Sequence, residues 1–168
     1  MKRVLLVSEA RTFGGAEVYL ERLAEGIPGW SACLAVPRRE ALSSWADRLA
    51  ARGVPVIRYD ETVIGWSRLG SKDVSAPDLV HVNLPSTYDG RCGLLPWRLR
   101  ALWGVPVTTS EHLTGLARSR RRLWLKRRTA SRVAGVLVAQ EANRKDLLAQ
   151  GLPASRIQVI PHGVPDPG

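Results

Sequence analysis

The sequence predicts an α/β protein with a doubly wound, parallel, Rossmann-like sheet. Its short apolar runs, such as residues 4–7 and 33–36, are unbroken rather than alternating. Such runs are typical of parallel strands that are buried on both faces. Segments with helical spacing of apolar residues lie between these runs along the whole chain. Alternation of strand and helix without internal repeats is the pattern of a doubly wound sheet.

The first half of the chain contains three predicted strands and two predicted helices. In order they are strand 4–7, helix 16–24, strand 33–36, helix 41–52 and strand 54–57. Glycine and proline end these elements: Gly26 and Pro28 follow the first helix, Pro37 follows the second strand, and Gly53 follows the second helix. Proline lacks the backbone donor that a helix or a central strand needs, and glycine favours a helix end.

The second half opens with an irregular connection over residues 60–77 and then alternates again. Its predicted elements are strand 79–82, helix 91–103, strand 105–109, helix 116–132, strand 136–138, helix 142–150 and strand 157–160. The segment 161–168 has three prolines and two glycines, which cannot continue a helix or a central strand. We therefore expect one domain over residues 1–160, followed by the start of a linker.

Composition restricts the class of protein. The chain has 168 residues, of which 45% are hydrophobic, so it suits one globular domain and not a disordered segment. Its cysteines, Cys33 and Cys92, are expected to be free thiols of a reducing compartment, and three histidines make a structural zinc site improbable. No run of 18 uncharged apolar residues occurs, and charges at the start of the chain precede any signal-peptide core. We expect a cytoplasmic protein.

The formal net charge of +10 comes from one region. Residues 91–132 hold eleven Lys and Arg against the single acid Glu111, whereas the rest of the chain has fourteen residues of each sign. A local excess of this kind indicates a surface that faces an anionic partner.

Gly14 and Gly15 lie in the loop between the first strand and its helix. Backbone N–H groups at a helix N-terminus can approach an anion, and the helix dipole favours negative charge there. The loop suits contact with a phosphate or a sugar, or it serves only as a tight turn. The loop does not have the GxGxxG pattern, and the sequence contains no P-loop motif. Residues 36–39, at the end of the second strand, lack the acidic residue that binds a nicotinamide dinucleotide, so a dehydrogenase is disfavoured.

Polar side chains end two further strands: His81 and Asn83 on one, and residues 110–112 on the next. In a doubly wound sheet these strand ends share one edge with the glycine loop, so Gly14, Asn83, Glu111 and His112 could line one cleft. A neutral imidazole such as that of His112 can exchange hydrogen bonds with a substrate hydroxyl, although a lone histidine at a strand end also suits a structural role. Glu111 should face away from His112 because neighbours on a strand alternate. We expect His81 to face a helix or the core.

The basic segment 118–128 allows three interpretations. One is a solvated helix face, the second is a nucleic-acid-binding surface, and the third is a surface for an anionic membrane, because apolar residues such as Trp124 lie among the arginines. No cluster of aromatic residues on a strand supports base stacking, which disfavours nucleic acid. The residues expected on this surface are Arg120, Arg121, Arg122, Lys126 and Arg127.

In their order and spacing, four segments together resemble the N-terminal half of a GT-B glycosyltransferase of the family 4-like kind. They are residues 4–7 followed by 13–17, residues 77–82, residues 105–112, and residues 138–153 running on to 156–164. The last segment is the most specific, and the resemblance covers essentially the whole chain. Two positions depart from the family pattern, since Gln140 replaces a usual serine and His162 replaces a usual asparagine.

The resemblance implies one half of a two-domain enzyme that transfers a sugar from a nucleotide-sugar donor to an acceptor. The N-terminal domain would hold mainly the acceptor, and a C-terminal domain, which does not occur in this sequence, would hold the nucleotide. A retaining reaction of the hexosyltransferase type, without a bound metal or other cofactor, is expected. His112 matches the histidine that contacts the transferred sugar near the reacting centre, so it is the expected catalytic residue. The expected substrate-binding residues are Gly14, Gly15, Arg11, Asn83 and Glu111.

The resemblance also suggests an acceptor that is lipid-linked or phosphorylated, and a peripheral position at the inner face of the membrane. Without the second domain, this polypeptide should have no transferase turnover, because half of the cleft is absent. Two alternatives stay open: a module that binds nucleic acid or an anionic surface, and another GT-B-like enzyme such as a nucleotide-sugar epimerase.

Overall fold

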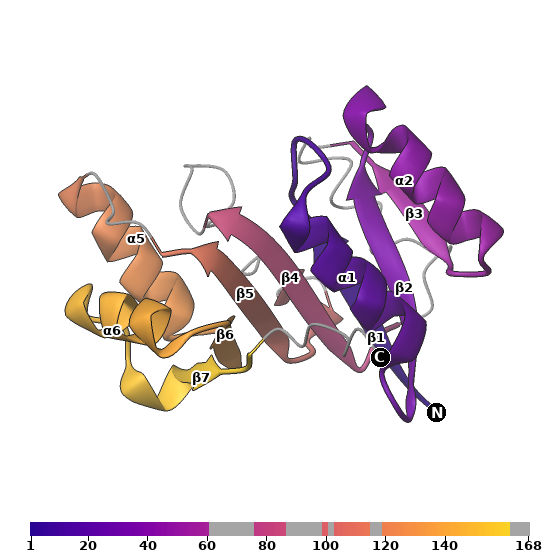
Figure 1. Ribbon diagram of the computed structural model, residues 1–168. Coiled ribbons are helices and arrows are strands. Elements are labelled where there is room, and N and C mark those ends of the chain that lie inside the picture. Colours follow the sequence, from indigo (N-terminus) through magenta and orange to yellow (C-terminus); the bar gives the residue numbers. More distant parts are fainter. Residues whose placement is uncertain (61–75, 87–98, 101–102, 115–118, 162–168) are drawn as a thin grey trace, which may run out of the picture.

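A computed structural model describes residues 1–60, 76–86, 99–100, 103–114 and 119–161 (Figure 1). Seven strands form one sheet in the order β3-β2-β1-β4-β5-β6-β7, and each neighbouring pair is parallel. The strands are β1 (Lys2–Ser8), β2 (Trp30–Pro37), β3 (Val56–Tyr59), β4 (Leu79–Ser86), β5 (Val107–Leu113), β6 (Gly135–Val138) and β7 (Ile157–Val159). The prediction of a parallel α/β sheet is confirmed.

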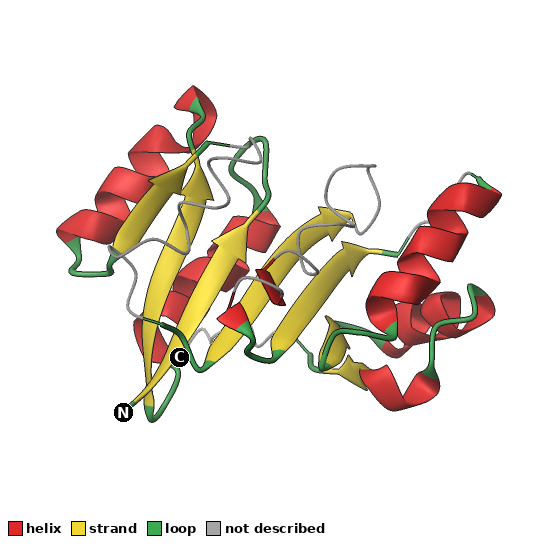
Figure 2. Ribbon diagram, turned by 180° about the vertical axis from the view of Figure 1, so that it is seen from behind, coloured by secondary structure: helices red, strands yellow, loops and turns green. Residues whose placement is uncertain are grey.

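Helices cover both faces of the sheet (Figures 1 and 2). They are α1 (Gly15–Gly26), α2 (Glu40–Ala51), α5 (Arg120–Ala130) and α6 (Glu141–Ala149), with a short 3-10 helix at Ala154–Arg156. The buried apolar residues of α1 and α2 pack with one set of strand residues, and those of α5 and α6 pack with the opposite set. The sheet is therefore doubly wound.

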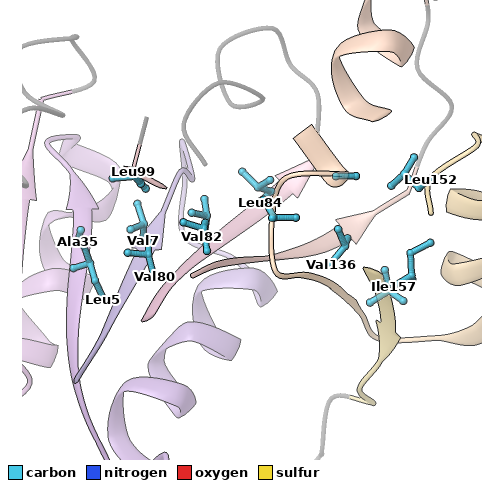
Figure 3. Packing of buried hydrophobic residues seen from close by; sticks show 14 of the residues in the cluster. Leu5, Val7, Ala35, Val80, Val82, Leu84, Leu99, Val136, Leu152 and Ile157 are labelled. Carbon is cyan, nitrogen blue, oxygen red and sulfur yellow. The ribbon is translucent and has the colours of Figure 1, made fainter. Parts of the chain in front are cut away.

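Alternate residues of each central strand enter separate cores. Val4 and Leu6 of β1 pack with Leu20 of α1 on one side of the sheet. Leu5 and Val7 point to the other side, into the core that Figure 3 shows. This alternation between two buried faces is the physical reason for the unbroken apolar runs in the sequence.

The chain places β2 and β3 on one side of β1, and β4 to β7 on the other. The strand order therefore reverses between β1 and β4, which is the topological switch point of the fold. Open parallel sheets bind ligands at such a point, outside the carboxyl ends of the strands. The loop after β1 and the end of β4 form the edge of the sheet at this point.

Some element bounds differ from the prediction. Strand β5 continues to Leu113, so residues 110–112 lie inside the strand and do not follow it. Helix α5 spans Arg120–Ala130, which is shorter than the predicted 116–132. The predicted connection 60–77 and helix 91–103 lie mostly outside the described residues, and so do Cys92, His162 and the predicted linker beyond 161. Cys33 is a free thiol, and burial raises its pKa to about 11.

Candidate functional site

The glycine loop leaves open space beside the N-terminus of α1. Gly14 is the N-cap of α1, and its carbonyl oxygen accepts from the backbone N–H groups of Glu17 and Val18, both at 3.1 Å. Its φ of −166° is extended backbone that any residue adopts, so a left-handed turn does not require glycine here. A Cβ at Gly15 would meet nothing within 4 Å. The loop thus has room for a ligand beside the N-terminal N–H groups of the helix.

Glu17 lies behind this loop and is buried. Its Oε1 lies 3.5 Å from the hydroxyl of Ser8, at the end of β1. Burial raises the pKa of the Glu17 carboxyl, and hydrogen bonds from the backbone and from Ser8 oppose that shift. An anion bound at the loop would raise this pKa further, because negative charges repel each other.

Asn83 connects the glycine loop to β5. It lies on β4 with 0% exposure, and its Nδ2 donates to the carbonyl oxygen of Ala16 at 2.9 Å. A carbonyl oxygen can only accept, so this bond fixes the orientation of the amide. Its Oδ1 accepts from the Ser110 hydroxyl at 2.6 Å and lies 2.6 Å from Nε2 of His112. Asn83 therefore links the start of α1 to Ser110 and His112 of β5 through hydrogen bonds of its buried amide.

The contact with Asn83 fixes the tautomer of His112. Because Oδ1 is an acceptor, Nε2 of His112 carries the hydrogen and donates it. In the neutral ring, Nδ1 is then the acceptor nitrogen. The ring of Tyr19, on α1, meets the His112 ring edge-on, with centroids 5.5 Å apart. His112 is half-buried, and its ring is oriented by groups from β4 and α1.

His81 lies on the same face of the sheet and deeper than His112. It is 4% exposed, and its Nδ1 lies 2.9 Å from the hydroxyl of Thr108. Its Nε2 has no hydrogen-bond partner among the described residues. Burial, and next the charge of His112, lower the pKa of His81 to about 4. The ring borders a mainly apolar hollow of about 780 Å³ between α1 and strands β4 to β7.

The low pKa of His81 predicts a loss of stability in mild acid. The unfolded chain takes up a proton near pH 6.5, whereas folded His81 takes it up only near pH 4. The contribution of neutral His81 is thus complete above pH 6.5 and is lost as the pH falls toward 4. We expect the free energy of unfolding to fall by about 2 kcal/mol from this residue between about pH 6.5 and 4.5.

Urea unfolding of the parent and of His81→Gln at these two pH values measures this effect. The variant should lose about 2 kcal/mol less than the parent, because glutamine does not titrate. Glu17 has a raised pKa and acts in the opposite direction, but it is present in both proteins and cancels in the comparison. Arg22 is a charged residue that lines the same hollow as His81, and its effect also cancels because it is present in both proteins. Equal losses in the two proteins would contradict the role assigned to His81.

Glu111 and Lys126 form a buried ion pair on the opposite face of β5. The Nζ atom of Lys126 lies 2.7 Å from Oε1 of Glu111, and both side chains are 1% exposed. Glu111 therefore faces α5, whereas His112 faces α1, as the alternation along a strand predicts. Glu111 is separated from the glycine loop by the sheet, so the structure places it beneath the site and not in the predicted cleft.

The other predicted residues lie at two places. Arg11 is exposed in the loop after β1, close in sequence to Gly14. Arg120, Arg121 and Arg122 are exposed at the start of α5. Lys126 and Arg127, the other two residues of the predicted basic surface, are held by contacts within the fold.

The structure corrects the position of Lys126, which is buried and paired with Glu111 and does not lie on the basic surface. Arg127 is exposed, but its Nε donates at 2.7 Å to the carbonyl oxygen of Gln150, at the end of α6. A cation at a helix C-terminus is favourable, so Arg127 contributes to the docking of α5 on α6. Lys126 lies one turn from Ala130 on the inner face of α5, a position that helical periodicity could have identified.

Tyr19 is the residue of the site that the sequence reasoning missed. It lies four residues after Gly15, one turn into α1, and its ring contacts those of His81 and His112. Burial raises the pKa of its hydroxyl. Its position one turn from the loop glycine is the signal that could have identified it. Among the described residues, no group of three or more His, Cys, Asp or Glu could hold a metal ion.

This fold and this arrangement define a Rossmann-like domain with a cluster of polar side chains at the switch point between β1 and β4. The family model of the glycosyl transferase 4-like domain matches residues 14–163, and the chain belongs to this family. A comparison with curated proteins finds no match. None of the described helices is long and apolar enough to cross a membrane.

Solved structures share the fold at low sequence identity. One is Anabaena HepE in complex with UDP-glucose (TM-score 0.75, 17% identity), which matches 98% of this chain and 44% of that chain. Another is MurG of Acinetobacter baumannii (0.59, 14%), with 99% and 47% covered. A third is the UDP-N-acetylglucosamine 2-epimerase of Rickettsia bellii (0.58, 13%), with 94% and 44% covered. The chain thus spans less than half the length of these proteins, and the likeness shows a GT-B type of fold.

Proposed function

We propose that this chain is the acceptor-side domain of a retaining glycosyltransferase of the hexosyltransferase type. The observation that carries the proposal is the arrangement of His112. Asn83 orients the His112 ring, and both residues lie at the same edge of the sheet as the open glycine loop. The match of residues 14–163 to the glycosyl transferase 4-like domain supports it. The complete enzyme would bind a nucleotide sugar mainly through a second domain that follows the linker at 161–168.

The residues divide into contact and positioning roles. Gly14, Gly15 and Arg11 would contact donor phosphate or acceptor, and His112 would exchange a hydrogen bond with the transferred sugar. Asn83 and Glu111 are buried and would act by positioning, Asn83 through His112 and the loop, and Glu111 through α5. Oriented dipoles of this kind stabilise a transition state in which charge develops on the sugar and on the departing diphosphate.

The acceptor is proposed to be lipid-linked or phosphorylated, and the enzyme to act in the cytoplasm at the inner face of the membrane. The donor is proposed to be a nucleotide sugar, because HepE has been crystallised with UDP-glucose. No metal or other cofactor is assigned to the reaction. The site residues come from the loop after β1 and from α1, β4 and β5, and the nucleotide would lie mainly on the second domain.

Ligand titration of the ¹⁵N-labelled chain tests the acceptor-side role. A panel of UDP-, GDP- and ADP-linked hexoses is expected to include one that shifts the resonances of Gly14, Gly15 and His112, with a Kd near about 1 mM, since only half of the cleft is present. The matching nucleoside diphosphate alone should shift His112 far less, because it lacks the sugar that His112 is proposed to contact. Equal shifts of His112 from the free nucleotide, or no shift from any member of the panel, would contradict the proposal.

Turnover distinguishes the transferase from the epimerase alternative. In the complete enzyme, proton NMR of the first product should show the anomeric configuration of the donor sugar, which is the signature of retention. Change of configuration at another carbon of the nucleotide sugar, without any acceptor, would instead identify an epimerase. The chain alone is expected to show neither activity, because the residues that bind the nucleotide lie elsewhere.

A further inference from the structure

The glycine loop, residues 9–14, needs support from outside its own segment. It connects β1 to α1, and residues 11–15 are exposed. Gly14 and Gly15 have no side chains that could pack, and glycine has more backbone freedom than any other residue. The proposed function requires the backbone N–H groups at the start of α1 to be in place before a ligand binds, because ordering them during binding would lower the affinity.

The start of α1 does little to fix the entry of the chain. Among the described residues, no side chain caps its N-terminus, since the N-cap is Gly14. Glu17, at the third helical position, supplies one half of a capping box, because its carboxylate accepts from the backbone N–H of Gly14. The direction in which the loop enters α1 is therefore only partly determined by α1 itself.

Phe13 precedes the N-cap, at a position from which an apolar side chain usually packs on its own helix. Its usual partner is the fourth helical residue, here Val18, in the contact called a hydrophobic staple. Val18 is 37% exposed, and the Phe13 ring lies against Trp45 of α2, with centroids 5.8 Å apart and planes tilted by 52°. The loop thus directs its aromatic contact to the neighbouring helix.

Two groups of α2 hold the Phe13 ring. One is Trp45, which is 1% exposed and belongs to the core beneath α1 and α2. The other is Arg48, whose guanidinium lies 5.6 Å from the centroid of the Phe13 ring. A tilted aromatic pair and a cation over a ring each favour one placement of the ring. Together they fix the residue that directly precedes Gly14.

Trp45 is itself held by both helices, which lie side by side on one face of the sheet (Figure 1). Its Nε1 donates at 3.1 Å to Oε2 of Glu21, on α1. The other oxygen of this carboxylate accepts at 2.6 Å from Arg52, the C-cap of α2. The start of the loop is fixed as well, because Ala10 is buried in the same core and its N–H donates to the Ser8 hydroxyl at 3.2 Å.

We infer that Phe13 is a positioning residue: its contacts with Trp45 and Arg48 hold the glycine loop, and with it the first N–H groups of α1, in the arrangement that binds a ligand. Phe13 acts through Gly14 and is assigned no contact with the reacting atoms. The inference rests on the proposed function, which it deepens by giving α2 a part in binding. Order in the loop can be measured without any sugar, so the two proposals can fail separately.

Relaxation of ¹⁵N in the unliganded chain tests the anchoring. The amide groups of Gly14 and Gly15 should have order parameters of about 0.85 in the parent and below about 0.6 in Phe13→Ala. Phe13→Tyr keeps the ring and should keep the parent values. The matched control Val18→Ala removes the other member of a staple and should leave the loop ordered. Both replaced side chains are partly exposed, so urea midpoints should stay close to that of the parent.

Steady-state kinetics of the complete transferase test the consequence for binding. When only a fraction of molecules has the loop in place, the apparent affinity falls by that fraction, whereas the bound state reacts as before. Phe13→Ala should raise the KM of one substrate, donor or acceptor, by about tenfold and change kcat by less than about threefold, since an aromatic pair and a cation–π contact are lost. Phe13→Tyr should restore the KM of the parent.

Four results overturn the inference. They are unchanged order parameters in Phe13→Ala, an equal loss of order in Val18→Ala, unchanged KM values in Phe13→Ala, and a failure of Phe13→Tyr to restore order and KM. An equal loss in Val18→Ala would assign the loop to a staple within α1. Loss of loop order in Phe13→Ala, in a complete enzyme that transfers no sugar, would support the anchor and contradict the proposed function.

Discussion

Replacing Lys126 with methionine is expected to lower the free energy of unfolding by about 3–5 kcal/mol, because it leaves the Glu111 carboxylate without its cation inside the protein. The two side chains are each 1% exposed, and Nζ lies 2.7 Å from Oε1. A buried ion pair need not stabilise the fold relative to apolar residues of similar size. Removing one partner is destabilising, however, because the other charge stays buried without a compensating partner. The effect should be among the largest of any single substitution on α5.

Urea denaturation of Lys126→Met and of two companion variants measures this loss. The double variant Glu111→Gln/Lys126→Met removes both charges and should recover about 2 kcal/mol or more of the loss, since no bare charge remains. The matched control Arg121→Met replaces an exposed cation on the same helix and should stay within about 0.5 kcal/mol of the parent. A loss below about 1 kcal/mol for Lys126→Met would show that the pair is solvated in solution.

The sheet could be predicted from the sequence because its signal is local. Val4, Leu5, Leu6 and Val7 are each almost completely buried, although alternate residues point to opposite cores. Only a strand covered on both faces requires four apolar residues in succession, so the run itself indicates a central parallel strand. Glycines with positive φ at helix and loop ends, such as Gly53 and Gly151, mark boundaries by the same kind of local rule.

The full length of β5 could not be predicted, because polar residues inside it are satisfied by partners far away in the sequence. Thr108 contacts His81, Ser110 donates to Asn83, and Glu111 pairs with Lys126. Read alone, the segment 110–112 suggests a strand that has ended. Burial of these polar side chains is favourable only because groups on β4 and α5 form hydrogen bonds and an ion pair with them. A buried polar group without such partners would cost free energy.

The candidate site shows the same limit. The strand pattern correctly placed His112 and Asn83 at one edge with the glycine loop, but it gave both of them substrate contact. The structure buries Asn83, and both polar atoms of its amide are engaged: Nδ2 donates to the carbonyl oxygen of Ala16, and Oδ1 accepts from Ser110 and His112. A buried side chain that is held in this way positions its neighbours, and this distinction depends on contacts that no local pattern contains.

Replacing His112 with alanine in the complete transferase is expected to lower kcat by about 10²- to 10³-fold, the typical cost of losing one oriented dipole at the reacting centre. The proposed contact strengthens as charge develops on the transferred sugar, so KM should change by less than kcat. Steady-state kinetics with the natural donor and acceptor measure both quantities.

The control for this prediction is Ser110→Ala, because the Ser110 hydroxyl donates to the same Oδ1 of Asn83 that accepts from His112, yet Ser110 is itself buried. Ser110→Ala should lower kcat by less than about threefold if Asn83 still holds the imidazole, and it should cost about 1 kcal/mol of stability. Similar losses of kcat in both variants would mean that the hydrogen-bond network maintains the shape of the edge and that His112 has no contact of its own with the sugar. A large loss confined to His112→Ala, with the fold intact, is the result that only a direct contact explains.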